Sequence, residues 1–269
     1  CSNRLESLNT LLDRIQKQKG NERMIQKNSV AVVTGSARNI GRATAVKLGE
    51  LGFHLVVHTN NDAENLEQTA DLVRQTGALC ATVLGSLDDP STIIALGHAC
   101  HEFGHCQVLV NNASVRKTKP FLEMTLEEWQ QVFRINTDAQ FMCTQQFLPD
   151  MLDAKWGRVI CLGGLSAHTG AQERAAVVSS KSSVPGLVRA LAVEFGDSGV
   201  TFNCVVPGHI DTHRTAETGA RLKHPSFDGK NVPYGSPSDI AAIIGMLVGP
   251  DSGFITGQTL HVNGGAFLP

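Results

Sequence analysis

From residue 29 onward, short apolar runs rich in β-branched residues alternate with longer stretches of helical periodicity. The first run, Val30–Val33, has no polar position, which is typical of a strand buried on both faces of a parallel sheet. The same pattern predicts further strands over Phe53–Val57, Cys80–Leu84, Val108–Val110, Val159–Leu162, Val200–Val206 and Thr259–Val262.

Apolar residues recur at helical spacing between these runs. The pattern predicts helices over Ala43–Leu51, Asn65–Thr76, Trp129–Met151 and Ser182–Phe195. Seven strands separated by helices predict an α/β protein with a Rossmann-type, doubly wound parallel seven-stranded sheet and helices on both faces. We find no repeat and no low-complexity linker, so the sequence predicts one domain over residues 29–269.

Two segments stand apart from this alternation. Residues 1–28 place Leu5, Leu8, Leu12 and Ile15 on one face of a helix, which predicts an N-terminal helical extension that covers the domain or contacts a neighbour. Residues 209–238 are polar and rich in Gly and Pro. Long loops of this kind in compact domains are usually functional, so we expect a substrate lid.

Charge and cysteine content narrow the range of functions. A net charge of −2 gives no basic surface for nucleic acid or an anionic membrane, and no apolar run is long enough to span a bilayer. The seven cysteines are scattered, without a C-x-x-C pair or zinc spacing. We therefore expect free thiols, no metal site and a reducing, cytoplasmic location.

The first predicted strand leads directly into Thr34–Gly41, with the sequence TGSARNIG, and then into a helix. Glycines at such a turn let the backbone approach a pyrophosphate, whose charge is favoured at a helix N-terminus. The strand before the turn, the helix after it and the second strand beyond are all present, as this motif requires. The alternative is a purely structural turn between a strand and a helix.

The order of five further motifs resembles the short-chain dehydrogenase/reductase family over residues 29–267. The family fingerprint T-G-x-x-x-G-x-G matches Thr34–Gly41, with Asn39 at the usual middle glycine, as in pteridine-reductase-like members. The other matches are Asn111–Ser114 (family N-N-A-G), Asn136, Lys181 opening a helix, Pro207–Gly208 and Asn263–Gly265.

The resemblance implies a nicotinamide cofactor, and two features favour NADP(H) over NAD(H). The second strand ends without a carboxylate until Asp62, although a carboxylate there would bind a ribose 2′-hydroxyl. Arg38 stands where NADP-preferring relatives carry a base. The implied cofactor-binding residues are Gly35, Ser36, Arg38, Asn39, Ile40, Gly41, His58, Thr59, Asn60, Ser86, Leu87, Asn112, Ala113, Lys181, Pro207, Gly208, Ile210 and Thr212.

The resemblance also implies a catalytic Tyr four residues before Lys181 and a Ser thirteen residues before that Tyr. These positions hold Val177 and Gly164, neither of which can donate a proton or a hydrogen bond from its side chain. Asn136 and Lys181 match the other two catalytic positions. We therefore expect a divergent active site and very slow or absent reduction of ordinary ketones.

Several residues could supply the missing chemistry. His168 is the best replacement acid or base, because imidazole titrates near neutral pH. Arg116 could hold an anionic or polar substrate. A phenol could come from the single tyrosine, Tyr234. The resemblance places the substrate near Gly164, Ser166, Arg116 and Val177.

Three functions remain open. One is an NADP(H)-dependent oxidoreductase that reduces a C=N bond or a conjugated C=C bond, or uses a replacement proton donor. Another is a non-redox isomerase, lyase or cyclase on the same scaffold. The third is a catalytically inactive NADP(H)-binding partner protein. The resemblance implies a small-molecule substrate and a homodimer or homotetramer that packs through the helices around Trp129–Met151 and Ser182–Phe195.

Overall fold

The computed structural model describes residues 29–212 and 234–269, which form one seven-stranded parallel sheet in the order β3-β2-β1-β4-β5-β6-β7. Every predicted strand is confirmed: β3 and β7 have the predicted ends, and the ends of the other five differ by at most three residues. The strands are β1 (Ser29–Val33), β2 (His54–Thr59), β3 (Cys80–Leu84), β4 (His105–Asn111), β5 (Gly157–Leu162), β6 (Val200–Pro207) and β7 (Thr259–Val262).

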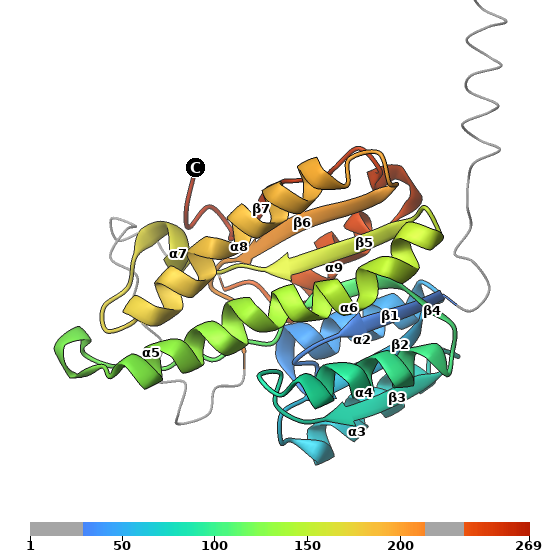
Figure 1. The fold of residues 1–269 in the computed structure, drawn as a ribbon, viewed down its shortest axis with the longest axis horizontal. Coiled ribbons are helices and arrows are strands. Elements are labelled where there is room, and N and C mark those ends of the chain that lie inside the picture. The colour runs from blue at the N-terminus through green and yellow to red at the C-terminus, as the bar shows by residue number, and fades with distance from the viewer. Residues whose placement is uncertain (1–28, 213–233) are drawn as a thin grey trace, which may run out of the picture.

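Helices cover both faces of the sheet, as predicted (Figure 1). One face carries α2 (Asn39–Glu50), α3 (Ala63–Arg74) and α9 (Pro237–Leu247). The other carries α4 (Pro90–His101), α6 (Ala139–Asp153) and α8 (Ala175–Glu194). Each set encloses its own apolar core against the sheet, so β1 and β4 are buried on both sides.

Three features differ from the sequence-based expectation. Helices α4 and α9 were not predicted, and α9 begins at Pro237, inside the segment expected to be a lid. Helix α8 begins at Ala175, so Lys181 lies in its second turn rather than opening it. The long helix predicted from Trp129 is divided into α5 (Leu126–Phe133), a π-helical turn over Arg134–Asp138 and α6.

The sheet order reverses between β1 and β4, and in doubly wound folds ligands bind at the carboxyl ends of the strands at such a point. None of the described helices is both long and apolar enough to cross a bilayer. The N-terminal extension and most of the predicted lid lie outside the described residues.

Six described cysteines are free thiols and are buried: Cys80, Cys100, Cys106, Cys143, Cys161 and Cys204. Burial raises the pKa of several of them, to about 12 for Cys143 and about 11 for Cys161. They act as small apolar core residues and are poor nucleophiles.

Candidate active site

The turn between β1 and α2 is closed by contacts that only glycine permits. Gly35 has a φ of +64°, and a Cβ on Gly41 would meet the Gly35 carbonyl oxygen at 2.3 Å. No side chain among the described residues caps the first turn of α2. The tight turn therefore brings bare backbone and the positive end of a helix to the pocket wall, which suits a phosphate group.

Asn112, which follows β4, braces this turn. Its Nδ2 donates to the Thr34 and Gly35 carbonyl oxygens at 2.9 and 2.8 Å. In return, the backbone N–H groups of Asn112 and Ala113 donate to Thr34 Oγ1 at 3.1 Å. Asn112 therefore has a structural role that accounts for its place in the motif.

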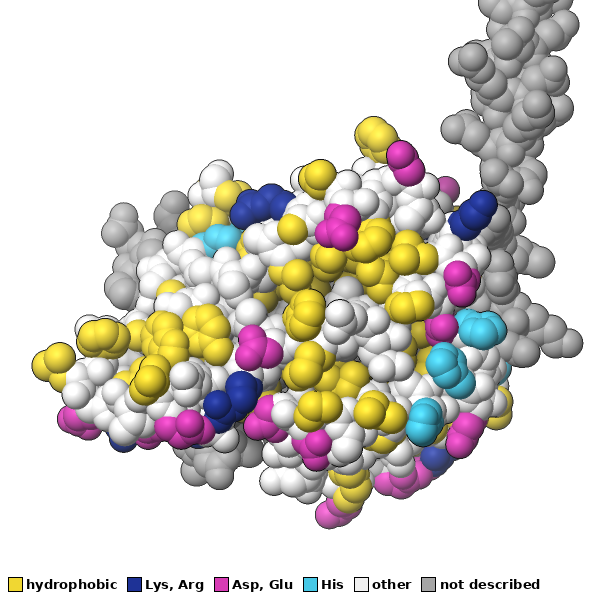
Figure 2. Space-filling view, in the orientation of Figure 1, with side chains coloured by type: hydrophobic (Ala, Val, Ile, Leu, Met, Phe, Trp, Pro, Cys, Tyr) yellow, Lys and Arg dark blue, Asp and Glu magenta, His cyan; other side chains and the backbone are white. Residues whose placement is uncertain are grey.

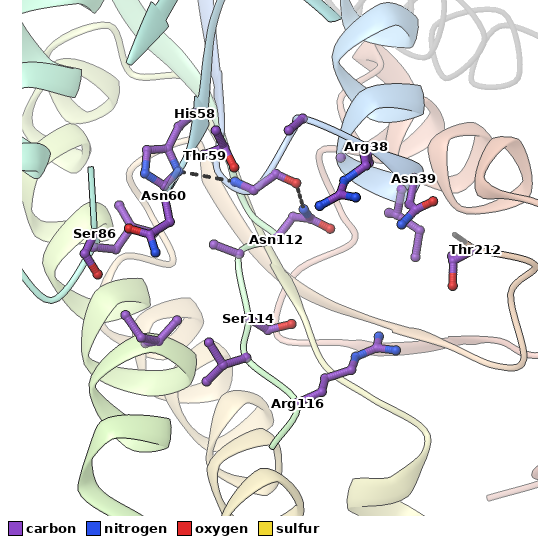
Figure 3. Close-up of a pocket in the computed structure, with 18 of the residues that line it drawn as sticks. Arg38, Asn39, His58, Thr59, Asn60, Ser86, Asn112, Ser114, Arg116 and Thr212 are labelled. Carbon is purple, nitrogen blue, oxygen red and sulfur yellow. Dashed lines mark hydrogen bonds between the residues drawn. The ribbon is translucent and has the colours of Figure 1, made fainter. Parts of the chain in front are cut away.

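His58, at the end of β2, holds the turn from the other side (Figure 3). The Gly35 N–H donates to His58 Nδ1 at 3.3 Å, and His58 Nε2 lies 2.9 Å from the Gly85 carbonyl oxygen. A carbonyl only accepts, so Nε2 carries the proton and the ring is neutral. Burial lowers the pKa of His58, because the charged form would lose its hydration.

We expect His58 to make the protein less stable in mild acid. The unfolded chain takes up the proton near the ordinary pKa of 6.5, whereas the folded protein resists it until lower pH. Stability is therefore lost as the pH falls below about 6.5, by at most about 1.4 kcal/mol per pH unit from this group. Unfolding free energies of wild type and His58→Gln between pH 7 and 5 should show a shallower slope in the variant.

The exposed His98 on α4 provides the matched control, since His98→Gln removes a histidine far from the turn. His168 and His261, whose pKa values burial also lowers, keep their own contributions in every variant. Equal slopes for wild type and His58→Gln would show that His58 does not couple folding to pH.

The turn opens into a pocket of about 380 Å³ (Figure 3). It is lined by many of the predicted cofactor residues: Gly35, Arg38, Asn39, Ile40, Gly41, His58, Thr59, Asn60, Ser86, Leu87, Asn112, Ala113 and Thr212. Ser114, Val115, Arg116, Gln131 and Ile135 also line it, and of these only Arg116 had been predicted as a site residue. Ser36 and Ile210 are buried beside the pocket and do not line it.

Arg38 and Asp62 form an ion pair at one end of this pocket, with 2.9 Å between Nη2 and Oδ2. Asp62 also accepts hydrogen bonds from the first turn of α3. The carboxylate that follows β2 thus contacts the arginine at the predicted 2′-phosphate position. Thr59 and Asn60, with uncharged side chains, line the pocket at the end of β2.

A second, smaller pocket of about 120 Å³ shares Arg116 with the first. It lies among the loops after β4, β5 and β6 and the first turns of α8. Its lining residues are Arg116, Gly163, Gly164, Leu165, Ser166, Gly170, Ala171, Arg174, Val177, Lys181, Pro207, Gly208 and His209. All the predicted substrate residues meet here, with Lys181, Pro207 and Gly208 from the cofactor set; Arg174 had not been predicted.

Lys181 is the most deeply buried of the charged groups that line the small pocket. Its side chain is 5% exposed, and Nζ donates to the Leu162 carbonyl oxygen at 2.6 Å. Burial, and then the positive charge of Arg116, lower the pKa of Lys181 to about 8. The ammonium group is therefore present at neutral pH and is lost in mild alkali.

Asn136 lies in the π-helical turn, a feature frequent at functional sites. It accepts from the Val115 N–H at 2.8 Å and donates to the Val115 carbonyl oxygen and Ser180 Oγ at 3.1 Å each. Asn136 is fully buried and lines neither pocket. It fixes the loop after β4 against α8, one residue from Lys181.

His168 lines neither pocket, although Ser166 and Gly170 on either side of it line the small one. It belongs to the short helix α7 (Ser166–Thr169), and its ring packs edge-on against His261 with centroids 4.5 Å apart. Phe267 lies 5.4 Å away. The Nε2 atom is buried without a hydrogen-bond partner among the described residues. A catalytic role for His168 stays a prediction, to which this packing lends no support.

Tyr234 is 47% exposed and contacts His209, with ring centroids 5.9 Å apart. It does not line the small pocket among the described residues. His209 does line that pocket.

Among the described residues, one cluster of side chains is of a kind that could hold a metal ion, and its members are too far apart in sequence to form a local motif. His101, His105 and Asp150 place their ligand atoms within 4.8 Å of one another. His101 Nε2 lies 3.1 Å from an Asp150 carboxylate oxygen, which also accepts from the Cys106 N–H. This group lies where β4 begins, at the opposite end of the strands from the nucleotide pocket.

Sequence comparisons identify related proteins over nearly the whole domain. The family model described as Enoyl-(Acyl carrier protein) reductase matches residues 35–266. The 3-oxoacyl-[acyl-carrier-protein] reductase FabG of Staphylococcus aureus (strain Mu50) is 31% identical and covers 88% of this chain and 98% of its own length. The FabG of Pseudomonas aeruginosa (strain PAO1) is also 31% identical, over 91% of this chain and 100% of its own length.

Solved structures show the same architecture. Acetoin dehydrogenase YohF from Salmonella typhimurium aligns with a TM-score of 0.79 and 28% identity, over 88% of this chain and 95% of its own. Acetoin dehydrogenase from Enterobacter cloacae gives 0.79 and 27%, over 91% of this chain and 100% of its own. The chain therefore belongs to the short-chain dehydrogenase/reductase family of oxidoreductases.

Proposed function

We propose that this protein is an NADP(H)-dependent reductase of a carbon–carbon double bond conjugated to a carbonyl group. One observation carries the proposal: Val177 and Gly164 line the same small pocket as the buried Lys181. The wall thus presents a cation but no phenol and no side-chain donor at the positions where the family resemblance implies Tyr and Ser. This pocket therefore favours a reaction that needs no proton donor at the substrate oxygen.

The large pocket fits the cofactor. The backbone cradle of Gly35 and Gly41 suits a pyrophosphate. Arg38 and the uncharged Thr59 and Asn60 suit the 2′-phosphate end, and Lys181 lies in the adjoining small pocket toward the nicotinamide end. A bound reduced nicotinamide would supply a hydride. The preference for NADP(H) rests on Arg38, whose partner Asp62 offsets part of its charge.

A conjugated double bond is reduced without an internal proton donor. When hydride adds to the β-carbon, the π electrons move to the carbonyl oxygen as an enolate, and the α-carbon then takes a proton from water. The buried positive charge of Lys181 favours the negative charge that develops. An iminium substrate would bring a positive charge into a pocket that already holds cations, so the C=N alternative is disfavoured.

The matching family model is that of an enoyl reductase, a name that also refers to reduction of a conjugated double bond. We also propose a cytoplasmic location and a homodimer or homotetramer. Apolar side chains gather on the face covered by α4, α6 and α8 (Figure 2), including the exposed Ile94, Phe141 and Val193. Such a face suits contact between subunits.

The test is NADPH oxidation followed with matched pairs of unsaturated and saturated carbonyl compounds. The pairs are 2-cyclohexenone with cyclohexanone, 4-oxopent-2-enoate with levulinate, and methyl 4-oxopent-2-enoate with methyl levulinate. We expect turnover of at least one unsaturated compound and a rate lower by about 10²-fold or more for its saturated partner. Tyr234→Phe should retain the activity of wild type.

Other outcomes overturn the proposal. Comparable rates for both members of each pair would indicate an ordinary carbonyl reductase, and loss of activity in Tyr234→Phe would identify its phenol as the acid. Tight NADPH binding without turnover would support an inactive partner protein. Conversion of the unsaturated compounds without NADPH consumption would support a non-redox enzyme.

A further inference from the structure

The small pocket has a strongly one-sided charge. Its described lining residues include Arg116, Arg174 and Lys181 and no aspartate or glutamate. Two of the three cations are buried, since Arg174 is 9% exposed and Lys181 is 5% exposed. The positive lining favours an anionic ligand over a neutral one.

The backbone just before α8 positions Arg174 at the wall of the small pocket. Glu173 adopts a φ of +57°, and its carbonyl oxygen accepts from the Lys119 N–H at 2.8 Å. This corner sets Arg174 immediately before α8, a helix of 20 residues with no side-chain cap among the described residues. The positive end of the helix and the guanidinium therefore meet at the same wall.

Arg116 approaches from a different element, the loop after β4, which Asn136 fixes through two hydrogen bonds to Val115. The positive charge of Arg116 helps to lower the pKa of Lys181. In Figure 3, which draws the large pocket, Arg116 lies below Ser114, and the same residue also lines the small pocket. Arg116 and Arg174 also interact with other groups of the chain, and their side chains reach the small pocket from two different loops.

We propose that the small pocket binds the carboxylate of an anionic substrate, a small unsaturated oxo acid, through Arg174 and Arg116. A planar guanidinium matches a carboxylate with two parallel hydrogen bonds, which a neutral ester cannot accept equally well. The cavity of about 120 Å³ limits the substrate to a short chain. This inference rests on the proposed function for the reaction, whereas the binding itself can be measured without turnover.

Calorimetric titration of the full chain with levulinate and methyl levulinate, with and without saturating NADP⁺, tests the proposal. The two probes differ in the charge of one group and cannot be reduced at a conjugated C=C bond. We expect levulinate to bind more tightly by about tenfold or more, as for hydrogen bonds to charged groups. Arg174→Gln should remove this preference, and Arg174→Lys should retain part of it.

Arg189→Gln is the matched control, because Arg189 is exposed on α8 and lines neither pocket. It should keep the preference of wild type. If Arg174→Gln does not fold, as judged by its melting curve, Arg116→Gln serves as the second variant. Equal affinities for acid and ester in wild type, or a preference unchanged in the folded Arg174 or Arg116 variant, would overturn the proposal.

The two proposals fail separately. Charge-selective binding of levulinate without turnover of any unsaturated compound would support the carboxylate site and contradict the proposed reductase activity. Equal turnover of methyl 4-oxopent-2-enoate and the free acid, with no binding preference, would support the reductase activity and contradict the carboxylate site.

Discussion

Val177→Tyr combined with Gly164→Ser is expected to raise the rate of saturated-ketone reduction by about 10²–10⁴-fold over wild type, because it supplies a general acid and an oxyanion donor. The pocket has room for at least the smaller change. A Cβ on Gly164 would meet only Lys181, at 3.8 and 4.0 Å, which is ordinary contact. Lys181, four residues after Val177 on the same helix, would lower the pKa of the new phenol.

The measurement is NADPH oxidation with cyclohexanone, alongside Val177→Phe combined with Gly164→Ala. That control adds similar volume at both positions without either hydroxyl. A gain confined to the hydroxyl-bearing variant would support the assignment of these two positions. If that variant folds, binds NADPH and still fails to reduce the ketone, the assignment of Val177 and Gly164 to the acid and donor positions is wrong.

Lys181→Met is expected to lower the rate of enone reduction by about 10²–10³-fold while making the protein more stable. The rate falls because the buried positive charge no longer stabilises the enolate. Stability rises at pH 7 because burial disfavours the ammonium, whose pKa falls to about 8. Methionine removes this cost, with a net gain on the order of 1–3 kcal/mol after the hydrogen bond to Leu162 is lost.

The two effects are measured as kcat/KM with 4-oxopent-2-enoate and as the free energy of unfolding. Lys47→Met, at a partly exposed position on α2, is the matched control and should leave kcat/KM unchanged. In wild type, kcat/KM should fall as the pH rises through about 8, where Lys181 loses its proton. Full activity in Lys181→Met, or a less stable variant, would contradict this account.

The strands were predictable because each contains a short run rich in apolar and β-branched residues. The run is continuously apolar over Val30–Val33, Val108–Val110 and Val159–Leu162, as a doubly buried parallel strand requires. The two missed helices had readable start signals. Asp89 caps α4 ahead of Pro90, and Ser236 forms a capping box with Asp239 at the start of α9. These signals went unused because α4 has a weak apolar periodicity and α9 follows a polar stretch that resembles a loop.

The residues of the site could be predicted where they belong to one contiguous motif, and could not be predicted where segments distant in sequence come together. The glycine turn follows from Thr34–Gly41 alone, since strand, turn and helix are contiguous. The ion pair of Arg38 with Asp62 and the entry of Arg174 into the small pocket depend on how loops from separate crossovers converge. The spacing of residues within one segment does not predict contacts between separate segments.

The buried thiols give the protein an internal reporter of opening. With their sulfur atoms enclosed and their pKa values raised, Cys143 and Cys161 cannot react with an alkylating reagent while the core that holds them stays closed. Because these two residues lie on α6 and β5, in the core between the sheet and α4, α6 and α8, their modification marks the moment when that layer separates. A molecule that fills either pocket and holds the layers together should therefore delay the modification.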